Sequence, residues 1–323
     1  MVFRFAWRSL LRRPFLNLIK IVGLSLTLCC VLFILLFLKS ELSFDRFHKH
    51  ADQIYRLTIT NGPEEENKHY ARIPNSSFVP ELHNYFPEIA RYVRLSPMRG
   101  GIIKHREKFF EIQQAFQCDS TFFAVFDAKL LQGNPDEILS APGNLVVSES
   151  FAKRVFGNEN PIDQILTLPS GQFYGENTDF VVKGIMQDFP QNSHFHPEVL
   201  ASPRDRNIFN GWAWTYLLLN KNSNPENISQ SFAAFEKEVF GREDGAIPSV
   251  AYLQSIQDIH LQSNKLREIE PSGNRMAIYS LSLAALLLLL IAFINYANLS
   301  IGLAAYTQKY FKVSKTLGAS TGN

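Results

Sequence analysis

The chain has 323 residues, of which 46% are hydrophobic and 19% are charged, with a formal net charge of +2. Of its three cysteines, Cys29 and Cys30 lie inside a long apolar run, which leaves Cys118 alone outside it. A single thiol excludes an internal disulfide and a cysteine-based zinc site, and redox chemistry is not expected.

The charges are sorted along the chain. All 30 acidic residues lie between Glu41 and Glu270, whereas the two flanks carry six and four basic residues and no acidic one. Because ten of the 32 basic residues lie in the flanks, 22 lie between Glu41 and Glu270. With 30 acidic residues, this interior has a net charge of −8, whereas the flanks together have +10. Basic residues beside membrane spans stay on the cytoplasmic side. The pattern predicts a multi-pass protein of the cytoplasmic (inner) membrane, with both termini in the cytoplasm and an extracytoplasmic domain between them.

The N-terminal residues 1–20 are predicted to form an amphipathic helix on the cytoplasmic face, with Arg4, Arg8 and Arg12 on one side. A basic topology signal with no further role explains the same residues equally well. The uncharged apolar run over 21–38 is long enough to cross roughly 30 Å of hydrocarbon. Its length and the lack of an A-x-A site favour an uncleaved transmembrane helix over a signal peptide.

Residues 39–277 form the predicted extracytoplasmic domain. Its first half is expected to contain a short helix capped by Ser43 or Asp45, a strand over 54–60, a helix over 76–90, alternating stretches over 91–96 and 102–116, and a helix over 121–131 that stops at Gly133. Its second half is expected to contain a strand and a helix over 145–157 with Ser148 as the cap and Gly157 as the stop, strands over 179–187, 197–202 and 213–220, a helix over 225–240 and a strand over 249–256. Strands and helices interleave without a regular βαβ rhythm, which predicts an α+β core domain between two transmembrane helices.

Two histidine pairs have the H-x-H spacing that places both imidazoles on one face of a strand, His48 with His50 and His194 with His196. A metal needs at least a third protein ligand, and nothing in the spacing provides one. We therefore interpret them as surface histidines beside polar turns, and no metal site is expected.

Catalytic signatures are missing from the sequence. Glu176, Asp179 and Asp188 could be paired as an acid and a base, but any acidic domain of this size offers such pairs. The sequence has no G-x-S-x-G, no H-E-x-x-H and no Gly-rich phosphate loop. Without a Walker A sequence the chain cannot hydrolyse ATP by itself. We expect no enzymatic activity, no catalytic residue, no cofactor and no nucleic-acid partner.

The second apolar segment covers residues 278–303. Asn295 and Asn298 lie three residues apart on one side of it. Amides in hydrocarbon seek partners on neighbouring helices, at roughly 0.6–2 kcal/mol each. Packing against further spans is the favoured interpretation, and a position in the headgroup region is the alternative.

The last segment, residues 304–323, is basic. Lys309, Lys312 and Lys315 recur every three residues with apolar residues between them, and Gly318 is expected to end the helix. Such a helix either lies on anionic membrane lipid or docks on a cytoplasmic partner. The pattern alone does not choose between these two roles.

Five ordered motifs identify a family. They are SFDRFHKHADQIYRL, then LLQGNP followed by VVSESFAKRVFGNENPI, then DFVVKGIMQDFPQNSHF, then LQSIQDIHLQSN followed by EIEPSGN, and finally INYANLS with KTLGAS. In this order they closely resemble ABC transporter permeases of the MacB/FtsX type, over essentially the whole chain.

The resemblance implies a MacB-like periplasmic core domain with two subdomains, a membrane-proximal one from about 41–98 and 200–270 and another inserted between them. It implies a partner, a separate cytoplasmic ABC ATPase subunit, met by a coupling helix. It also implies two more spans, so the sequence is expected to be the front part of a longer permease. A second permease protomer, forming a dimer, is implied as a further partner. Such permeases transmit ATP-driven motion to the extracytoplasmic side for efflux or for release of envelope substrates.

The coupling segment matches the family pattern K-E-x-G-I-R-K-x-L-G-A only in part. The matching residues, expected to engage the ATPase, are Lys309, Lys315, Leu317, Gly318 and Ala319. Tyr310, Lys312 and Ser314 replace a glutamate, a glycine and an arginine, which removes two charge-assisted contacts.

Two other functions are compatible with two spans and an outer domain. A membrane sensor would continue from the second span into a heptad-rich signalling helix, and the 20 residues of 304–323 have no heptads. An envelope scaffold without transport is the other alternative. The presence of a neighbouring ATPase gene would separate these functions from a permease.

Overall fold

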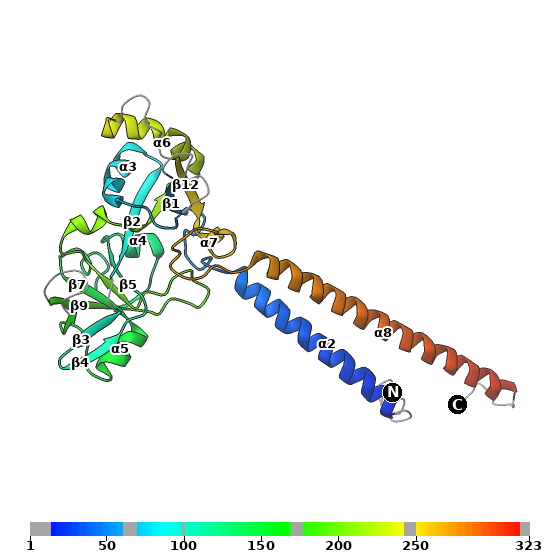
Figure 1. Ribbon diagram of the computed structural model, residues 1–323. Coiled ribbons are helices and arrows are strands. Elements are labelled where there is room, and N and C mark those ends of the chain that lie inside the picture. Colours follow the sequence, from blue (N-terminus) through cyan, green and yellow to red (C-terminus); the bar gives the residue numbers. More distant parts are fainter. Residues whose placement is uncertain (1–13, 61–69, 99–100, 169–176, 242–249, 317–323) are drawn as a thin grey trace. The chain divides into compact units, whose positions relative to one another are not determined.

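The computed structural model describes residues 14–60, 70–98, 101–168, 177–241 and 250–316 (Figure 1). The chain divides into two compact units. The helical unit comprises Met1–Leu42 and Asn274–Asn323, and the core unit comprises Ser43–Gly273. The amphipathic helix predicted over 1–20 falls mostly outside the described residues.

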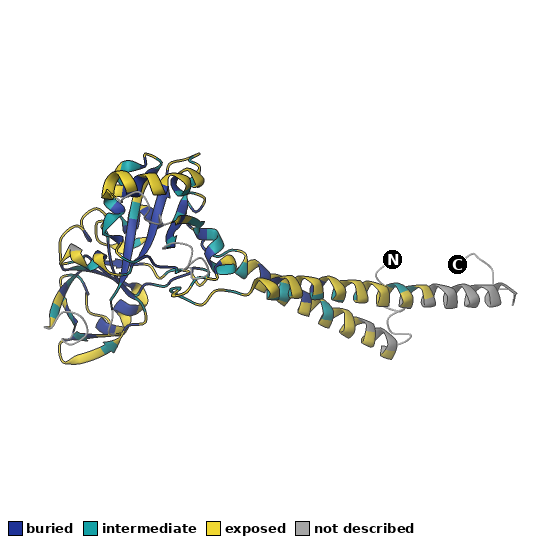
Figure 2. Cartoon of the chain, turned by 45° about the horizontal axis from the view of Figure 1, so that its top comes forward, coloured by how far each residue is buried: buried dark blue, intermediate teal, exposed yellow. Residues whose placement is uncertain are grey.

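The helical unit contains two long helices that pack against each other, α2 (Pro14–Glu41) and α8 (Arg275–Thr316). Ile21–Glu41 and Arg275–Asn298 are long and apolar enough to cross a membrane. Most of their residues are exposed and only a few are buried (Figure 2). A helix that is apolar on all sides and exposed on most of them is suited to lipid as its solvent. These stretches overlap the spans predicted over 21–38 and 278–303.

The core unit is built on one mixed sheet. Its strands are β1 (Ile54–Thr60), β2 (Ile89–Pro97), β3 (Ile102–His105), β4 (Lys108–Glu111), β5 (Ala115–Cys118), β6 (Leu130–Gln132), β7 (Asn144–Ser148), β8 (Ile165–Leu168), β9 (Thr178–Met186), β10 (Val199–Ala201), β11 (Trp214–Leu219) and β12 (Val250–Ser255). The strand order is β12-β1-β11-β2-β5-β10-β7-β9-β8-β3-β4, and β6 pairs with β9. The pairs β10·β5 and β7·β9 are parallel and the other pairs are antiparallel. The predicted α+β class is confirmed.

Helices cover both faces of the sheet. On one face of β1, β2, β11 and β12 lie α3 (Val79–Tyr85) and α6 (Pro225–Phe240) (Figure 1). On the other face lie α4 (Phe122–Phe126) and α7 (Ile256–Gln262), while α5 (Glu149–Phe156) packs on β7 and β9. Strand β11 is buried on both faces, because Leu217 belongs to the core under α6 and Tyr216 to the core under α4. Two short 3-10 helices, η2 (Ser76–Phe78) and η3 (Arg206–Asn210), complete the unit.

Two helices begin and end where local chemistry predicts. Ser148 caps α5 by accepting a hydrogen bond from the Phe151 N–H, and Gly157 follows its last turn with a φ of 62°. The helix α6 spans the predicted residues, because the side chain of Asn224 accepts from the backbone at its start and Gly241 ends it with a φ of 61°.

Three of the predicted elements are wrong. The helix expected over 76–90 is only η2 and α3, because the chain becomes strand β2 at Ile89 to pair with β11. The helix expected over 121–131 ends at Phe126, because 130–132 pair with β9. Gly133 therefore stops no helix. A Cβ there would lie 2.8 Å from the Lys183 carbonyl, so glycine permits the close approach to β9. The short helix expected after Ser43 is a series of turns.

The predicted subdomains correspond to neighbouring parts of one sheet. Residues 41–98 and 200–270 supply β12, β1, β11 and β2, which are adjacent in the strand order. The remaining strands come from the segment between them. Because Ser43–Gly273 holds together as one compact unit, the division into two subdomains stays a prediction.

Candidate functional site

Two segments connect the core unit to the helices, and we call them the junction segments. The first, residues 43–53, follows α2, and the second, residues 263–273, precedes α8. Both make hydrogen bonds to residues 187–196, which we call the junction loop. The side chains that make these contacts and continue them into the sheet form the junction cluster: Asp45, Gln114, His194, His196, Tyr216 and Glu270.

Asp45 fastens the first junction segment to the loop. Its φ is 57°, a left-handed conformation that Asp adopts more readily than most residues. The buried Oδ1 accepts hydrogen bonds from Nδ1 of His194 at 2.8 Å and from the His194 N–H at 3.2 Å. The Asp45 N–H donates to the Asn192 carbonyl at 2.8 Å. Burial raises the pKa of the carboxyl, but the charge and hydrogen bonds of His194 outweigh it, so the pKa lies below the ordinary 3.8.

His194 extends this contact into the sheet. Its Nε2 lies 2.7 Å from the hydroxyl of Tyr216 on β11. Tyr216 is fully buried, and burial raises its pKa far above the ordinary value, so the hydroxyl keeps its proton. Nδ1–H of His194 donates to Asp45, and Nε2 of the same ring is hydrogen-bonded to the hydroxyl of Tyr216. The three side chains therefore form a continuous buried hydrogen-bonded chain.

Arg56 holds the second junction segment against the same sheet. It lies on β1 with its side chain fully buried, and it forms a two-pronged ion pair with Glu268. The same guanidinium donates to Oε1 of Gln254 at 2.7 Å and to Oγ of Ser263 at 3.1 Å. The positive charge of Arg56 opposes the rise in the pKa of Tyr216. Arg56 therefore interacts with the last member of the buried chain that Asp45 and His194 begin.

His196 and Glu270 make the second direct contact with the junction loop. Nδ1 of His196 donates to Oε1 of Glu270 at 2.6 Å, and the amide of Gln114 donates to the same oxygen. The hydrogen bond to Glu270 raises the pKa of His196 above the ordinary 6.5. Burial raises the pKa of Glu270, but the bonds to His196 and Gln114 outweigh it, so that pKa falls below 4.5. Each group therefore favours the charged form of the other.

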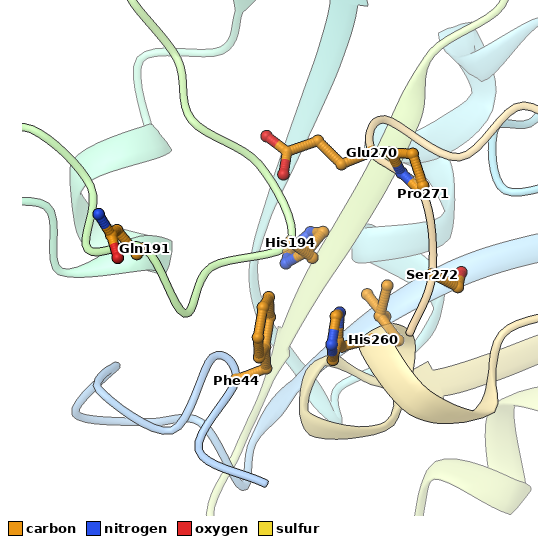
Figure 3. Close-up of a pocket in the computed structure, with 8 residues that line it drawn as sticks. Phe44, Gln191, His194, His260, Glu270, Pro271 and Ser272 are labelled. Atoms are coloured by element: carbon orange, nitrogen blue, oxygen red, sulfur yellow. The ribbon is translucent and has the colours of Figure 1, made fainter. Parts of the chain in front are cut away.

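A small hollow lies between the three segments. Its lining residues are Phe44, Gln191, His194, Ile259, His260, Glu270, Pro271 and Ser272 (Figure 3). The rings of Phe44 and His260 stack with centroids 3.3 Å apart and planes 2° apart. The carbonyl of His260 accepts a hydrogen bond from the Gly273 N–H at 2.7 Å. Helix α7 therefore contacts both junction segments through one residue.

His48 belongs to the same region. It is buried, and its Nδ1 donates to the Phe126 carbonyl at 2.6 Å. Burial lowers its pKa below the ordinary 6.5, although that hydrogen bond and the charge of Asp45 oppose the shift. Among the described residues, neither Nε2 of His48 nor Oδ2 of Asp45 has a hydrogen-bond partner. The neutral form of His48 is therefore the one that this site favours.

The description of the H-x-H residues as surface histidines is wrong for His48 and His194. His48 and His194 are only 3% and 5% exposed, and His50 and His196 are half-buried. The partners of His48, His194 and His196 come from distant parts of the chain, which the spacing could not reveal. His50 is bonded to Gln53, three residues further on. Within the described ranges, no three His, Cys, Asp or Glu side chains are placed to hold a metal.

The carboxylates considered as an acid–base pair have structural contacts. Asp188 accepts hydrogen bonds from the N–H and hydroxyl of Ser150 at the start of α5, and Asp179 accepts one from Thr167 at 2.6 Å. Glu176 lies outside the described residues. Most polar atoms of the junction cluster are likewise used in internal hydrogen bonds, which fasten chain segments together.

The residues selected from the sequence lie in the helical unit. Asn295 and Asn298 are exposed on α8, which leaves their amides available to neighbouring helices. Lys309 and Lys315 belong to the same helix, and Leu317, Gly318 and Ala319 lie outside the described residues. Sequence reasoning missed the junction cluster, although it singled out Asp45 as a helix cap and His194 with His196 as a histidine pair.

Comparison with known proteins gives a family and a fold. Residues 18–235 match the family model of the MacB-like periplasmic core domain. A domain assigned to a permease protein of Porphyromonas gingivalis has a TM-score of 0.53 and 16% identity, covering 72% of this chain and 98% of that one. This likeness supports a shared fold. A comparison with curated proteins gave no match.

Two more distant structures are also similar. The periplasmic region of MacB from Actinobacillus actinomycetemcomitans has a TM-score of 0.45 and 18% identity, over 65% of this chain and 91% of that one. The extracellular domain of the noncanonic ABC-type transporter YknZ from Gram-positive bacteria has a TM-score of 0.43 and 13% identity, over 62% and 99%.

Proposed function

The chain belongs to the family of MacB/FtsX-type ABC transporter permeases, and we propose that it couples a separate cytoplasmic ATPase to movement of its extracytoplasmic core unit. The ATPase drives export or the release of an envelope substrate. The chain supplies the membrane helices and the outer domain, and hydrolysis takes place on the ATPase subunit. In this proposal the core unit lies on the extracytoplasmic side of the membrane and both termini lie in the cytoplasm.

The observation that carries this proposal is the fastening of both junction segments to one loop. The first segment is held through Asp45 and His194, and the second through Glu270 and His196. Residues 194 and 196 are two positions apart, so a displacement of one segment relative to the other strains a single short stretch of backbone. Because the segments continue into α2 and α8, helix movement reaches the core unit through these bonds.

For the junction segments to connect the helices rigidly to the core unit, their hydrogen bonds to the junction loop must stay intact while the helices move. Charge-assisted hydrogen bonds contribute about 1.5–3 kcal/mol each when they are protected from water. Asp45 is fully buried, and the Arg56–Glu268 pair adds a second buried attachment. These two buried attachments form the proposed rigid connection between the junction segments and the sheet.

At the cytoplasmic end, the coupling segment is the proposed contact with the ATPase. Leu317 is assigned as an apolar anchor, with Lys309 and Lys315 at the rim and Gly318 and Ala319 as further contact residues. The exposed amides of Asn295 and Asn298 are assigned to packing against further permease spans or a second protomer. Membrane lipid surrounds the remaining apolar surface of both helices.

Co-purification tests the assignment. Leu317→Ala should weaken recovery of the ABC ATPase from detergent more than Lys309→Ala does, because buried interface anchors cost about 1–3 kcal/mol and exposed charges less. The assay requires the further spans that the family resemblance implies. Failure of the wild-type permease to retain any ATPase would contradict the proposed function. The reverse order of the two variants would point to lipid binding by the basic segment instead.

A further inference from the structure

The ring of His196 faces a hydrogen-bond acceptor at each of its nitrogens. Nδ1 lies 2.6 Å from Oε1 of Glu270, and Nε2 lies 3.1 Å from the carbonyl oxygen of Pro190. Its backbone N–H donates to Oε1 of Gln114 at 2.7 Å, and Gln114 also donates to Glu270. The ring therefore bridges the second junction segment and the start of the junction loop.

Only the cationic ring satisfies both contacts. Imidazolium donates from both nitrogens, whereas neutral imidazole carries one N–H and one lone pair. Without the second proton, a lone pair faces either the Glu270 carboxylate or the Pro190 carbonyl, and the contact becomes repulsive. The geometry by itself makes the bridge depend on protonation of His196.

The surrounding charges act in the same direction. Glu270 from the second junction segment and Asp45 from the first both favour the cation, while partial burial opposes it. His194, on the junction loop itself, favours the ionised form of Glu270. The bridge is complete when Glu270 is ionised and His196 is protonated.

We infer that His196 and Glu270 form a pH-sensitive latch that fastens the second junction segment to the junction loop most firmly from mildly acidic to neutral pH and loosens it in alkaline surroundings. For its effect on coupling, this inference rests on the proposed function. The latch itself is a property of the core unit and needs no ATPase.

The sign follows from the two titrations. A histidine whose pKa is raised on folding contributes stability that is present below 6.5 and lost as pH rises through its pKa in the folded protein. A carboxyl whose pKa is lowered contributes stability that is present above 4.5 and lost as pH falls through its pKa in the folded protein. The latch is therefore closed at pH values between the pKa of Glu270 and the pKa of His196 in the folded protein.

A nitroxide at Ser272 tests the latch, because this exposed residue lines the hollow beside Glu270. The full chain carries Ser272→Cys with Cys29 and Cys30 replaced by alanine, in phosphatidylcholine nanodiscs without ATPase. The remaining Cys118 is buried. We expect an immobilised spectrum at pH 6 and a mobile one above the pKa of His196. A spectrum unchanged between pH 6 and pH 9 would overturn the inference.

Two variants separate the latch from general loosening. His196→Gln should be mobile throughout the range, whereas Glu270→Gln should keep a transition whose midpoint falls toward the ordinary histidine value of 6.5. His83→Gln on α3 is the matched control and should behave as the wild type. A transition that persists in His196→Gln would assign the titration to another group and reject the latch. Because no ATPase is present, this outcome leaves the permease proposal standing.

Discussion

The carboxylate of Asp45 accepts a hydrogen bond at 2.8 Å from Nδ1 of His194, although 149 residues separate the two in the chain. The backbone N–H of His194 also donates to Asp45, and the next backbone N–H, that of Phe195, donates to Oγ of Ser193 within the loop. One buried contact thereby ties the start of the core unit to the loop that also holds its end. In the proposed coupling, movement of α2 reaches the core unit through this tie.

Replacing Asp45 should weaken the whole core unit. Asp45→Asn removes the charge that His194 faces in a fully buried place, and we expect a loss of about 1–3 kcal/mol in unfolding free energy. Asp163→Asn is the control, because its ion pair with Lys183 is on the surface and should contribute less than about 1 kcal/mol. Thermal unfolding followed by near-ultraviolet circular dichroism measures both. Equal losses in the two variants would show that burial of Asp45 has no energetic consequence.

Breaking the Arg56–Glu268 ion pair should lower the unfolding free energy more than replacing Asp45 does. Arg56→Met leaves the Glu268 carboxylate partly buried without its partner, which costs about 3–5 kcal/mol. Arg106→Met makes the same change in an exposed pair with Glu159 and should cost less than about 1 kcal/mol. The comparison uses chemical unfolding of the full chain in detergent. A small effect at Arg56 would mean that water reaches the pair.

His48 should make the protein less stable in mild acid. Its pKa is lowered by burial, so the unfolded chain takes up a proton below 6.5 that the folded protein resists. Stability then falls as pH drops, by up to about 1.4 kcal/mol per unit. His48→Gln should flatten the change in melting temperature between pH 7.5 and pH 5.5, while His83→Gln should not. A wild-type slope retained in His48→Gln would assign the acid sensitivity to other groups.

The charge distribution predicts the topology. A cysteine introduced at Asn222, an exposed turn residue of the core unit, should react with a membrane-impermeant maleimide in intact spheroplasts. A cysteine at Asn323 should react only after lysis. Both are placed in a background without Cys29, Cys30 and Cys118. Protection at Asn222 in intact cells would place the core unit in the cytoplasm.

Elements fixed by interactions between residues close in the sequence could be predicted, whereas those fixed by distant residues could not. Helices α5 and α6 were predictable because Ser148, Asn224 and the glycines that follow act within one turn. The residues 130–132 were assigned to a helix because their pairing with β9, more than fifty positions away, leaves no local trace. The burial of His194 was unpredictable for the same reason, since its partner Asp45 is 149 residues distant. The H-x-H spacing marked the right residues without revealing what they bind.

The central claim is that nucleotide at the ATPase changes the junction. The permease with a nitroxide at Ser272 is assembled with its ABC ATPase in nanodiscs at pH 6, where the latch is closed, and spectra are compared without nucleotide and with vanadate-trapped ADP. A second sample carries the label at Asn222, an exposed turn residue outside both junction segments and the junction loop. We expect trapping to change mobility at Ser272 and to leave Asn222 unchanged. If the ATPase is bound and active but trapping alters neither label, the junction does not carry the motion and the account is wrong.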